Sequence, residues 1–152
     1  MDSFSFYDLE KSIKAEEEQR FILYNNELEE ARRIIRNENE PWKTAHIFFE
    51  LTHHDLFTTE FKDLGEFAAW AGVSRPKLSI YCKALEYAIS HGISESISIY
   101  KVYSLSMLGE NYKDFMSIVE SHNIRVQDLS DKRIEELVKS YENGLLEDEL
   151  DE

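Results

Sequence analysis

The stretch LGEFAAWAGVSRPKLSIYCK, residues 64–83, has the spacing of two short helices joined by a glycine turn. Ala68 is small at the point where two crossing helices would touch, and Gly72 allows the positive φ that a short turn needs. Ser74 suits the N-cap of the second helix, because its hydroxyl can accept from a free amide, and Pro76 is tolerated in the first turn. The inward-facing positions are occupied by Phe67, Ala71, Val73, Leu78 and Tyr81. The pattern predicts a helix-turn-helix.

The second helix of this unit carries residues suited to DNA. In helix-turn-helix proteins the second helix enters the major groove and presents its early and outward residues to bases and phosphates. Arg75 suits a bidentate guanine contact, Lys77 and Lys83 suit phosphates, and Ser79 suits either partner. The outward residues predicted to face DNA are Ser74, Arg75, Lys77, Ser79, Ile80 and Lys83. A plain helical hairpin that happens to carry this pattern is the alternative.

The charge of the chain is unevenly distributed. The net charge of −14 opposes nonspecific DNA affinity, because such affinity comes mainly from Lys and Arg that neutralise phosphates. Residues 41–108 hold seven acids and six bases, whereas residues 1–40 hold eleven and six, and residues 109–152 hold thirteen and five. Residues 72–85 contain three bases and no acid. We therefore expect modest, strongly salt-dependent DNA affinity, or binding as a dimer.

The composition predicts an all-α fold. The chain of 152 residues is 42% hydrophobic and has only five glycines and two prolines, which favours a single helical domain with appendages. The lone cysteine, Cys82, excludes an intramolecular disulfide and a cysteine-based zinc site. The sequence has no apolar run of about eighteen residues and no signal-like amino terminus, so we expect a cytoplasmic protein without a membrane partner.

The organisation follows from breaks in the helical pattern. Residues 1–40 form a long N-terminal helical segment, residues 41–108 the helix-turn-helix core, residues 109–144 C-terminal helices, and residues 145–152 an acidic tail. The first segment contains one long helix or two. Its second half has a short heptad seam of Phe21, Tyr24, Leu28, Ala31 and Ile35. The seam predicts either a homodimer contact or packing on its own domain.

Several boundaries are predicted from capping residues. The pair Thr58-Thr59 has the character of a cap or turn, and Asn111 that of an N-cap. Ser130 is expected to cap the last helix, which Gly144 ends. The tail, LLEDELDE, is expected to be solvated and frayed, with the alternative that it competes with DNA for the basic helix.

The other polar clusters do not indicate catalysis or metal binding. His46 and His53 stand seven residues apart on one helical face, but His54 points about 100° away, which disfavours zinc. Cys82 is expected to serve as a small buried hydrophobe. The sequence has no glycine-rich phosphate loop and no nucleophile elbow. We therefore expect a protein that is not an enzyme and needs neither metal nor cofactor.

The layout resembles that of a known group. WKTAHIFFEL, TTEFKDLGEFAAWAGVSRPKLSIYCKALEYA, SIYKVYSLSMLG and LSDKRIEELVKSY are similar to segments of small phage, plasmid and integrative-element proteins. The helix-turn-helix of those proteins looks like that of plasmid partition proteins. The resemblance implies a DNA-binding or regulatory role on a mobile element, with Ser74, Arg75, Lys77 and Lys83 at the recognition-helix positions. The chain differs from the group in its acidity.

Two function classes remain open. The first is a sequence-specific regulator of a phage or plasmid that binds double-stranded DNA through the helix-turn-helix, as a homodimer. The second is an acidic anti-defence inhibitor, similar in kind to anti-CRISPR proteins, that binds a host nucleic-acid-binding protein by mimicking DNA. We favour the first, because the predicted recognition helix is free of acids in its first three turns.

Overall fold

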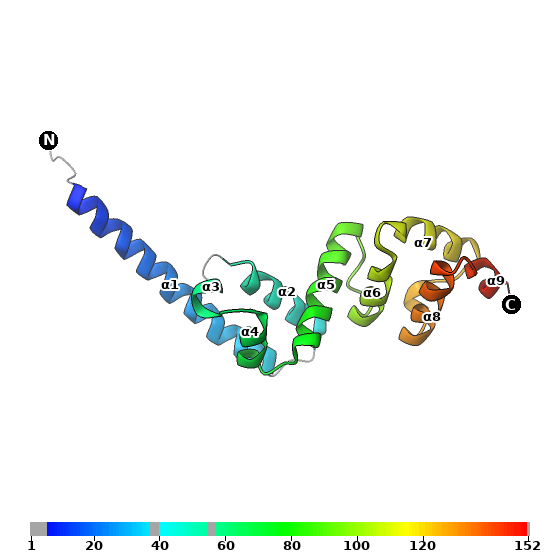
Figure 1. Cartoon of the computed structure of the whole chain (residues 1–152), viewed down its shortest axis with the longest axis horizontal. Helices are drawn as coiled ribbons and strands as arrows, with labels where there is room; N and C mark the ends of the chain where they lie inside the picture. Colours follow the sequence, from blue (N-terminus) through cyan, green and yellow to red (C-terminus); the bar gives the residue numbers. More distant parts are fainter. Residues whose placement is uncertain (1–5, 37–39, 55–56, 152) are drawn as a thin grey trace.

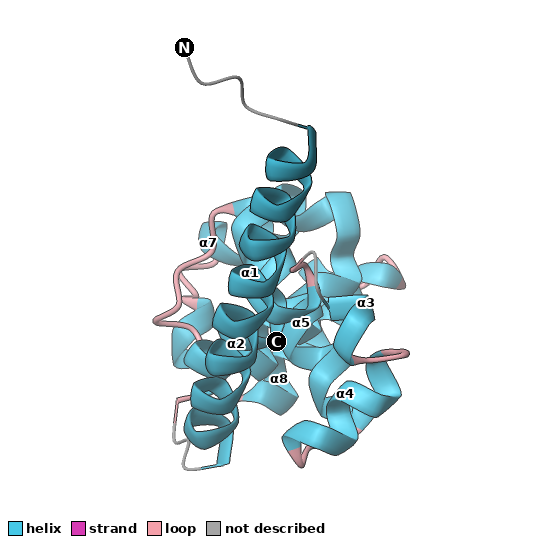
Figure 2. Ribbon diagram, turned by 90° about the vertical axis from the view of Figure 1, so that its left-hand side faces the viewer, coloured by secondary structure: helices cyan, strands magenta, loops and turns pink. Residues whose placement is uncertain are grey.

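The computed structural model describes residues 6–36, 40–54 and 57–151. Every regular element in these residues is helical, which confirms the all-α prediction (Figure 2). The α-helices are α1 (Phe6–Arg36), α2 (Pro41–Thr52), α3 (Phe57–Glu60), α4 (Leu64–Ala71), α5 (Arg75–His91), α6 (Ile99–Leu105), α7 (Tyr112–Ser121), α8 (Asp131–Glu142) and α9 (Leu146–Leu150). Two 3-10 helices, η1 (Ser106–Asn111) and η2 (Val126–Asp128), lie between them.

The helices form an elongated molecule (Figure 1). The N-terminal half of α1 projects from one end, and its C-terminal half lies against α2 and α4. Helix α5 occupies the middle, where it packs against α2 and α6. Helices α7, α8 and α9 form the opposite end. The central helix α5 is therefore held on two sides by other parts of the chain.

Helix α1 is one continuous helix, of the two alternatives predicted. Tyr24, Leu28, Ala31 and Ile35 are buried, and the Tyr24 hydroxyl donates to the Leu51 carbonyl oxygen at 3.5 Å. The seam thus packs against its own domain, because α2 and α4 cover it. The side chain of Phe21 lies outside the described residues. A homodimer would have to use a surface other than this seam.

In the unit from α4 to α5, the glycine turn and the serine cap lie where the sequence placed them. Gly72 adopts a left-handed conformation with φ 76°, as a tight turn between two helices requires. Ala68 is only 2% exposed, and α4 contacts α5. Ser74 accepts a hydrogen bond from the Lys77 amide at 3.2 Å and so caps α5. Helix α5 ends at His91, and the following Gly92 adopts a left-handed conformation with φ 64°.

One capping prediction was wrong, and another was right in position only. Thr58 lies inside α3, and the cap of α4 is Asp63, whose carboxylate accepts from the Glu66 amide at 2.9 Å. The burial of Phe57 within α3 explains the shift, since the chain turns only after this side chain has reached the core. Asn111 occupies the N-cap position of α7, as predicted, but it makes no side-chain capping hydrogen bond, because η1 runs directly into α7 there.

The acidic tail is folded, so the prediction of a frayed terminus was wrong. It forms α9, and the side chain of Leu146 is 3% exposed among the residues of the core. Glu149 accepts a 2.7 Å hydrogen bond from Arg133 of α8. Helix α9 lies beyond α6 and α8 from α5 (Figure 1), so its carboxylates do not contact the basic face of α5.

Candidate nucleic-acid interface

One face of α5 carries most of the predicted DNA-contacting residues. Ser74, Arg75, Ser79 and Lys83 are exposed. With 3.6 residues per turn, Arg75, Ser79 and Lys83 fall within about 80° of the helix circumference and along about 12 Å of its axis. We call these three residues the α5 stripe. The stripe contains two cations, one hydroxyl and no carboxylate.

Packing holds the stripe outward. On the opposite side of α5, Leu78, Tyr81 and Leu85 are each at most 3% exposed. The ring of Phe48 from α2 lies 6.1 Å from that of Tyr81, between ring centroids, and 6.0 Å from that of Phe67 in α4. Because aromatic contacts tie α2, α4 and α5 together, α5 has little freedom to rotate about its axis.

Lys77 and Ile80 do not join the stripe. Lys77 is half-buried and lies about 160° around the helix from Ser79. Its ammonium nitrogen sits 5.4 Å from the centroid of the Tyr81 ring, a cation–π distance. Ile80 is partly buried against the core. The structure therefore divides the six predicted residues into the exposed α5 stripe, the exposed N-cap Ser74, and two partly buried residues outside the stripe, Lys77 and Ile80.

Two tyrosines that the sequence analysis did not select lie next to the stripe. The Lys83 ammonium nitrogen is 5.6 Å from the centroid of the Tyr103 ring in α6. Tyr100, also in α6, is 43% exposed, and its hydroxyl oxygen is 3.4 Å from that of Tyr81. Their spacing of three residues on a helix was the available signal, but only the packing of α6 on α5 brings Tyr103 to Lys83 and Tyr100 to Tyr81.

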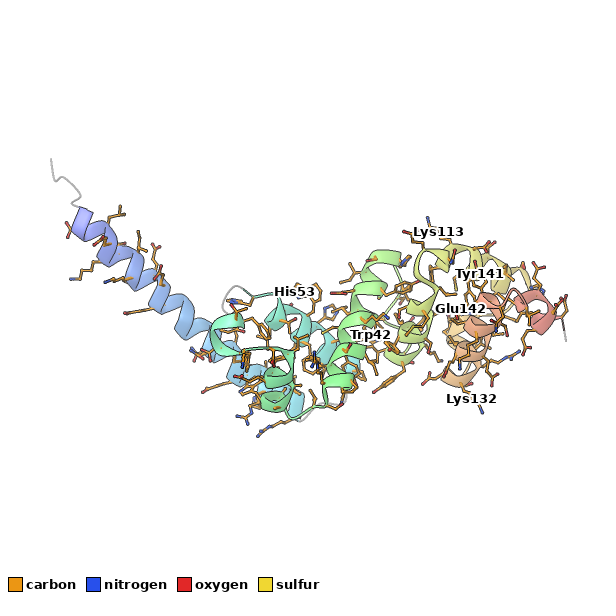
Figure 3. All side chains as sticks on the ribbon, viewed as in Figure 1. Trp42, His53, Lys113, Lys132, Tyr141 and Glu142 are labelled. Atoms are coloured by element: carbon orange, nitrogen blue, oxygen red, sulfur yellow. The ribbon has the colours of Figure 1, made fainter. Side chains whose placement is uncertain are left out.

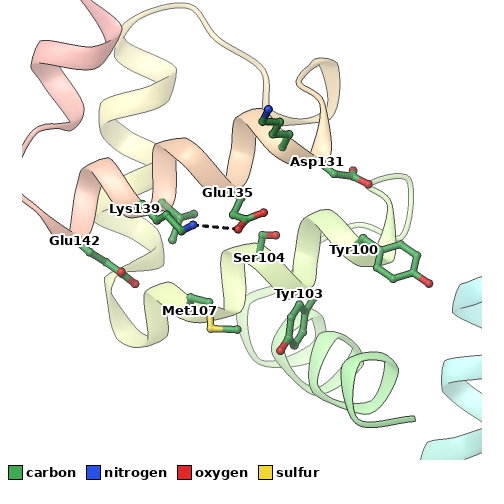
Figure 4. Close-up of a pocket in the computed structure, with 10 residues that line it drawn as sticks. Tyr100, Tyr103, Ser104, Met107, Asp131, Glu135, Lys139 and Glu142 are labelled. Carbon is green, nitrogen blue, oxygen red and sulfur yellow. Dashed lines mark ion pairs between the residues drawn. The ribbon is translucent and has the colours of Figure 1, made fainter. Parts of the chain in front are cut away.

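The tyrosines open into a groove between α6 and α8 with a volume of about 610 Å³. Tyr100, Tyr103 and Met107 form one wall, and α8 forms the other (Figure 4). Carboxylates and ammonium groups alternate along α8, and Lys139 pairs with Glu135 at 3.2 Å. This groove is therefore mixed in charge and partly apolar.

The cationic character of α5 ends within the helix. Glu86 is exposed and lies on the same side as Arg75 and Ser79, one turn beyond Lys83.

The pKa of the Cys82 thiol is raised to about 11, mainly by burial and then by the charge of Glu86. Cys82 is therefore a protonated, half-buried thiol at neutral pH and a poor nucleophile.

His46, His53 and His54 each contact a different side chain and do not converge on one site. His46 Nε2 lies 3.0 Å from a Glu95 carboxylate oxygen. The ring of His53 stacks on Phe49, and that of His54 stacks on Tyr24. Asp55, the carboxylate considered with them, lies outside the described residues. Among the residues that the structure describes, no group of three or more His, Cys, Asp or Glu side chains is placed to hold a metal ion.

No protein-family model matches the chain, and no curated protein sequence or solved structure matches it. Within the described ranges, no helix is both long and apolar enough to cross a membrane. The function is therefore argued from the surface around α5 and from the motif residues themselves.

Proposed function

We propose that the protein binds double-stranded DNA through α4 and α5, with the first half of α5 in the major groove. The observation that carries this proposal is the α5 stripe, an exposed face without carboxylates at the start of a helix whose other faces are packed. A helix held in this way can enter a groove of about 12 Å width without rearrangement of its domain.

The roles proposed for the stripe follow from side-chain chemistry. The guanidinium of Arg75, in the first turn, donates to a guanine O6 and N7, and the Lys83 ammonium contacts a phosphate. Ser74 accepts from the Lys77 amide, which leaves its own hydroxyl proton to donate to a phosphate oxygen. Lys77 is half-buried and lies about 160° around the helix from Ser79, so it is expected to matter less than Lys83.

The charge of the whole chain limits the affinity. A net charge of −14 repels DNA at long range, and Glu86 prevents the stripe from extending along the helix. We therefore propose a sequence-specific regulator of a mobile element that binds one preferred site and has little nonspecific affinity. Two copies on a two-fold symmetric site would double the number of protein–DNA contacts, with each copy using the same α5 stripe.

Direct binding measurements test this proposal. A preferred duplex is first selected from random-sequence DNA at about 50 mM salt, where phosphate contacts are strongest, and its affinity is measured by fluorescence anisotropy. We expect Arg75→Ala to cost about 1–3 kcal/mol and to relax selection at one base position. Lys83→Ala should weaken binding to all sequences and reduce the salt slope by about one.

Lys113→Ala is the matched control, since Lys113 is an exposed lysine at the start of α7 (Figure 3), next to Tyr112, which packs on Tyr87 and His91 at the end of α5 opposite to Arg75. It removes the same charge as Lys83→Ala and should leave affinity and salt slope nearly unchanged. If Lys83→Ala and Lys113→Ala have equal effects, or if no duplex is enriched, α5 does not read DNA.

A second function is favoured by one observation on α1. Glu16, Glu17 and Glu18 are exposed on the projecting half of that helix, where three adjacent carboxylates can stand in for phosphates. An inhibitor that mimics DNA would present them to a nucleic-acid-binding protein. If the protein is such an inhibitor, changing all three to glutamine would abolish capture of the partner, and the α5 variants would have no effect. If the protein binds DNA, the α5 variants would weaken binding and the glutamine variant would not.

A further inference from the structure

A second groove lies between α1 and α2 and is open to solvent, with a volume of about 630 Å³. Its floor is apolar and consists of Ala31, Ile34, Ile47 and Leu51. Its walls are acidic, with Glu27 and Glu30 on α1 and Glu50 on α2. All three of these carboxylates are exposed. The groove thus combines an apolar strip with negative charge on both sides.

We propose that this groove binds a basic amphipathic helix of a partner protein. Such a helix lays its apolar stripe on the floor, as in other helix-in-groove complexes, and places Lys or Arg side chains against both walls. A volume of several hundred Å³ is the size of a site that takes up side chains rather than single ions. The charge of the walls selects a cationic partner over a neutral or acidic one.

The three carboxylates of the groove are not expected to contribute equally to the binding of a cationic helix. Among the residues that the structure describes, no Lys or Arg lines the groove, but Arg33 forms an ion pair with Glu30 from outside and the charge of Lys43 also acts on this carboxylate. The charge of Glu30 is therefore partly compensated within the chain. Glu27 and Glu50, on opposite walls, then contribute most of the field that an incoming helix meets, and their neutralisation should have larger effects than that of Glu30.

The groove between α6 and α8 does not fit such a partner equally well. Asp131, Glu135 and Glu142 line it together with Lys132 and Lys139, so a cationic helix would meet charges of both signs. The groove between α1 and α2 also shares no residue with the α5 stripe. The proposal therefore does not rest on DNA binding, and either one can fail without the other.

The test uses a fluorescein-labelled amphipathic Leu/Lys peptide as the probe and a scrambled peptide of the same composition as its control. Anisotropy is measured with the full chain at about 0.15 M salt, where diffuse surface attraction is largely screened. We expect the amphipathic peptide to bind about tenfold more tightly than the scrambled one, because only the former has an apolar stripe. Backbone NMR shifts should change in residues 26–36 and 47–54.

Charge variants locate the interaction. The triple change E27Q/E30Q/E50Q should weaken binding about tenfold, since it removes the carboxylates on both walls. The triple change E110Q/E120Q/E147Q removes the same charge from exposed carboxylates of η1, α7 and α9 and should change affinity less than twofold, as expected for distant charges. A single change, Ile34→Arg, places a cation on the floor and should abolish binding with retention of the circular dichroism spectrum.

Three results would each overturn the proposal. Equal affinity for the two peptides would show that the apolar floor is not used. Equal losses in the two triple variants would show that the net charge alone attracts the probe. The Ile34→Arg variant keeps all the carboxylates of the groove. If it bound the peptide unchanged, the peptide would bind outside this groove.

Discussion

The two acidic ends of the described chain differ in how they are held. Residues 8–19, the outer half of α1, are exposed along their whole length. Helix α9 is shorter and has three acids in its first turn, yet it is docked on α7 and α8. Leu146 of α9 is 3% exposed, whereas Leu9 and Ile13 of α1 are 44% and 46% exposed. A buried apolar anchor, and not the density of charge, decides whether an acidic helix packs.

The outer half of α1 owes its helical form to continuity with the docked half. An isolated helix of about twelve residues is marginal in water, because nucleation is costly. In α1 the nucleus is supplied by the packed turns around Tyr24, Leu28 and Ala31. The contrast between anchored and unanchored helix leads to three predictions, ordered by the size of the expected effect.

The largest effect should come from removing the anchor of α9. Leu146→Ala leaves a cavity where the side chain is 3% exposed and should lower the free energy of unfolding by about 2–5 kcal/mol. Ile13→Ala, on the outer half of α1, should change it by no more than about 0.5 kcal/mol. Urea unfolding followed by circular dichroism measures both values, and similar losses would contradict the contrast.

The same contrast exists within α4, between two adjacent alanines. Ala68 is 2% exposed and faces the core, whereas Ala69 is exposed. Ala68→Leu should overpack the contact and cost about 1–3 kcal/mol, and Ala69→Leu should be nearly neutral. Thermal unfolding of the two variants provides the measurement. An unchanged melting midpoint for Ala68→Leu would argue against a close crossing of α4 and α5.

The smallest effect concerns the pH dependence of α9 docking. The pKa of His122 is raised from its ordinary value of 6.5 by the hydrogen bond between Nδ1 and the Ile118 carbonyl oxygen, and then by Asp151. A raised pKa in the folded state means that the stabilisation is complete below the unfolded pKa and is lost as pH rises through the folded value.

Amide exchange in α9 should therefore be slower at about pH 5.5 than at about pH 8.5, after correction for the intrinsic rate. The His122 side chain lies just after α7 and is 25% exposed, whereas Asp151 is 69% exposed, so solvent screens the pair and the difference should be small. Asp151→Asn should reduce it and lower the His122 pKa measured by NMR. A pKa of 6.5 in the unchanged protein would contradict the proposed link between His122 and the tail.

Local features of the sequence predicted much of the fold because the forces that act on them are local. Ser74 and Ser130 cap the helices that follow them, as expected, since each hydroxyl reaches an amide three residues ahead. Thr58 has the same capping chemistry, yet Asp63 caps α4. Where several residues are able to cap, the burial of Phe57 and Phe61 decides which one does.

The candidate interface was predictable in part for the same reason. Helical periodicity alone places Arg75, Ser79 and Lys83 on one side of α5. It did not identify Tyr103, which reaches Lys83, or Tyr100, which reaches Tyr81, because both contacts depend on how α6 packs against α5.

The sequence by itself determined the helical class, the Gly72 turn, most helix ends and the acid-free start of α5, all of which depend on neighbours within about one helical turn. Only the tertiary structure decided that the seam of α1 is covered by its own domain, that α9 docks through Leu146, and that α1 and α2 enclose an acidic groove. Each of these features depends on which apolar helix faces pack together. Burial of apolar area stabilises contacts between helices that are distant in the sequence as well as between neighbours, so local patterns do not determine which faces meet.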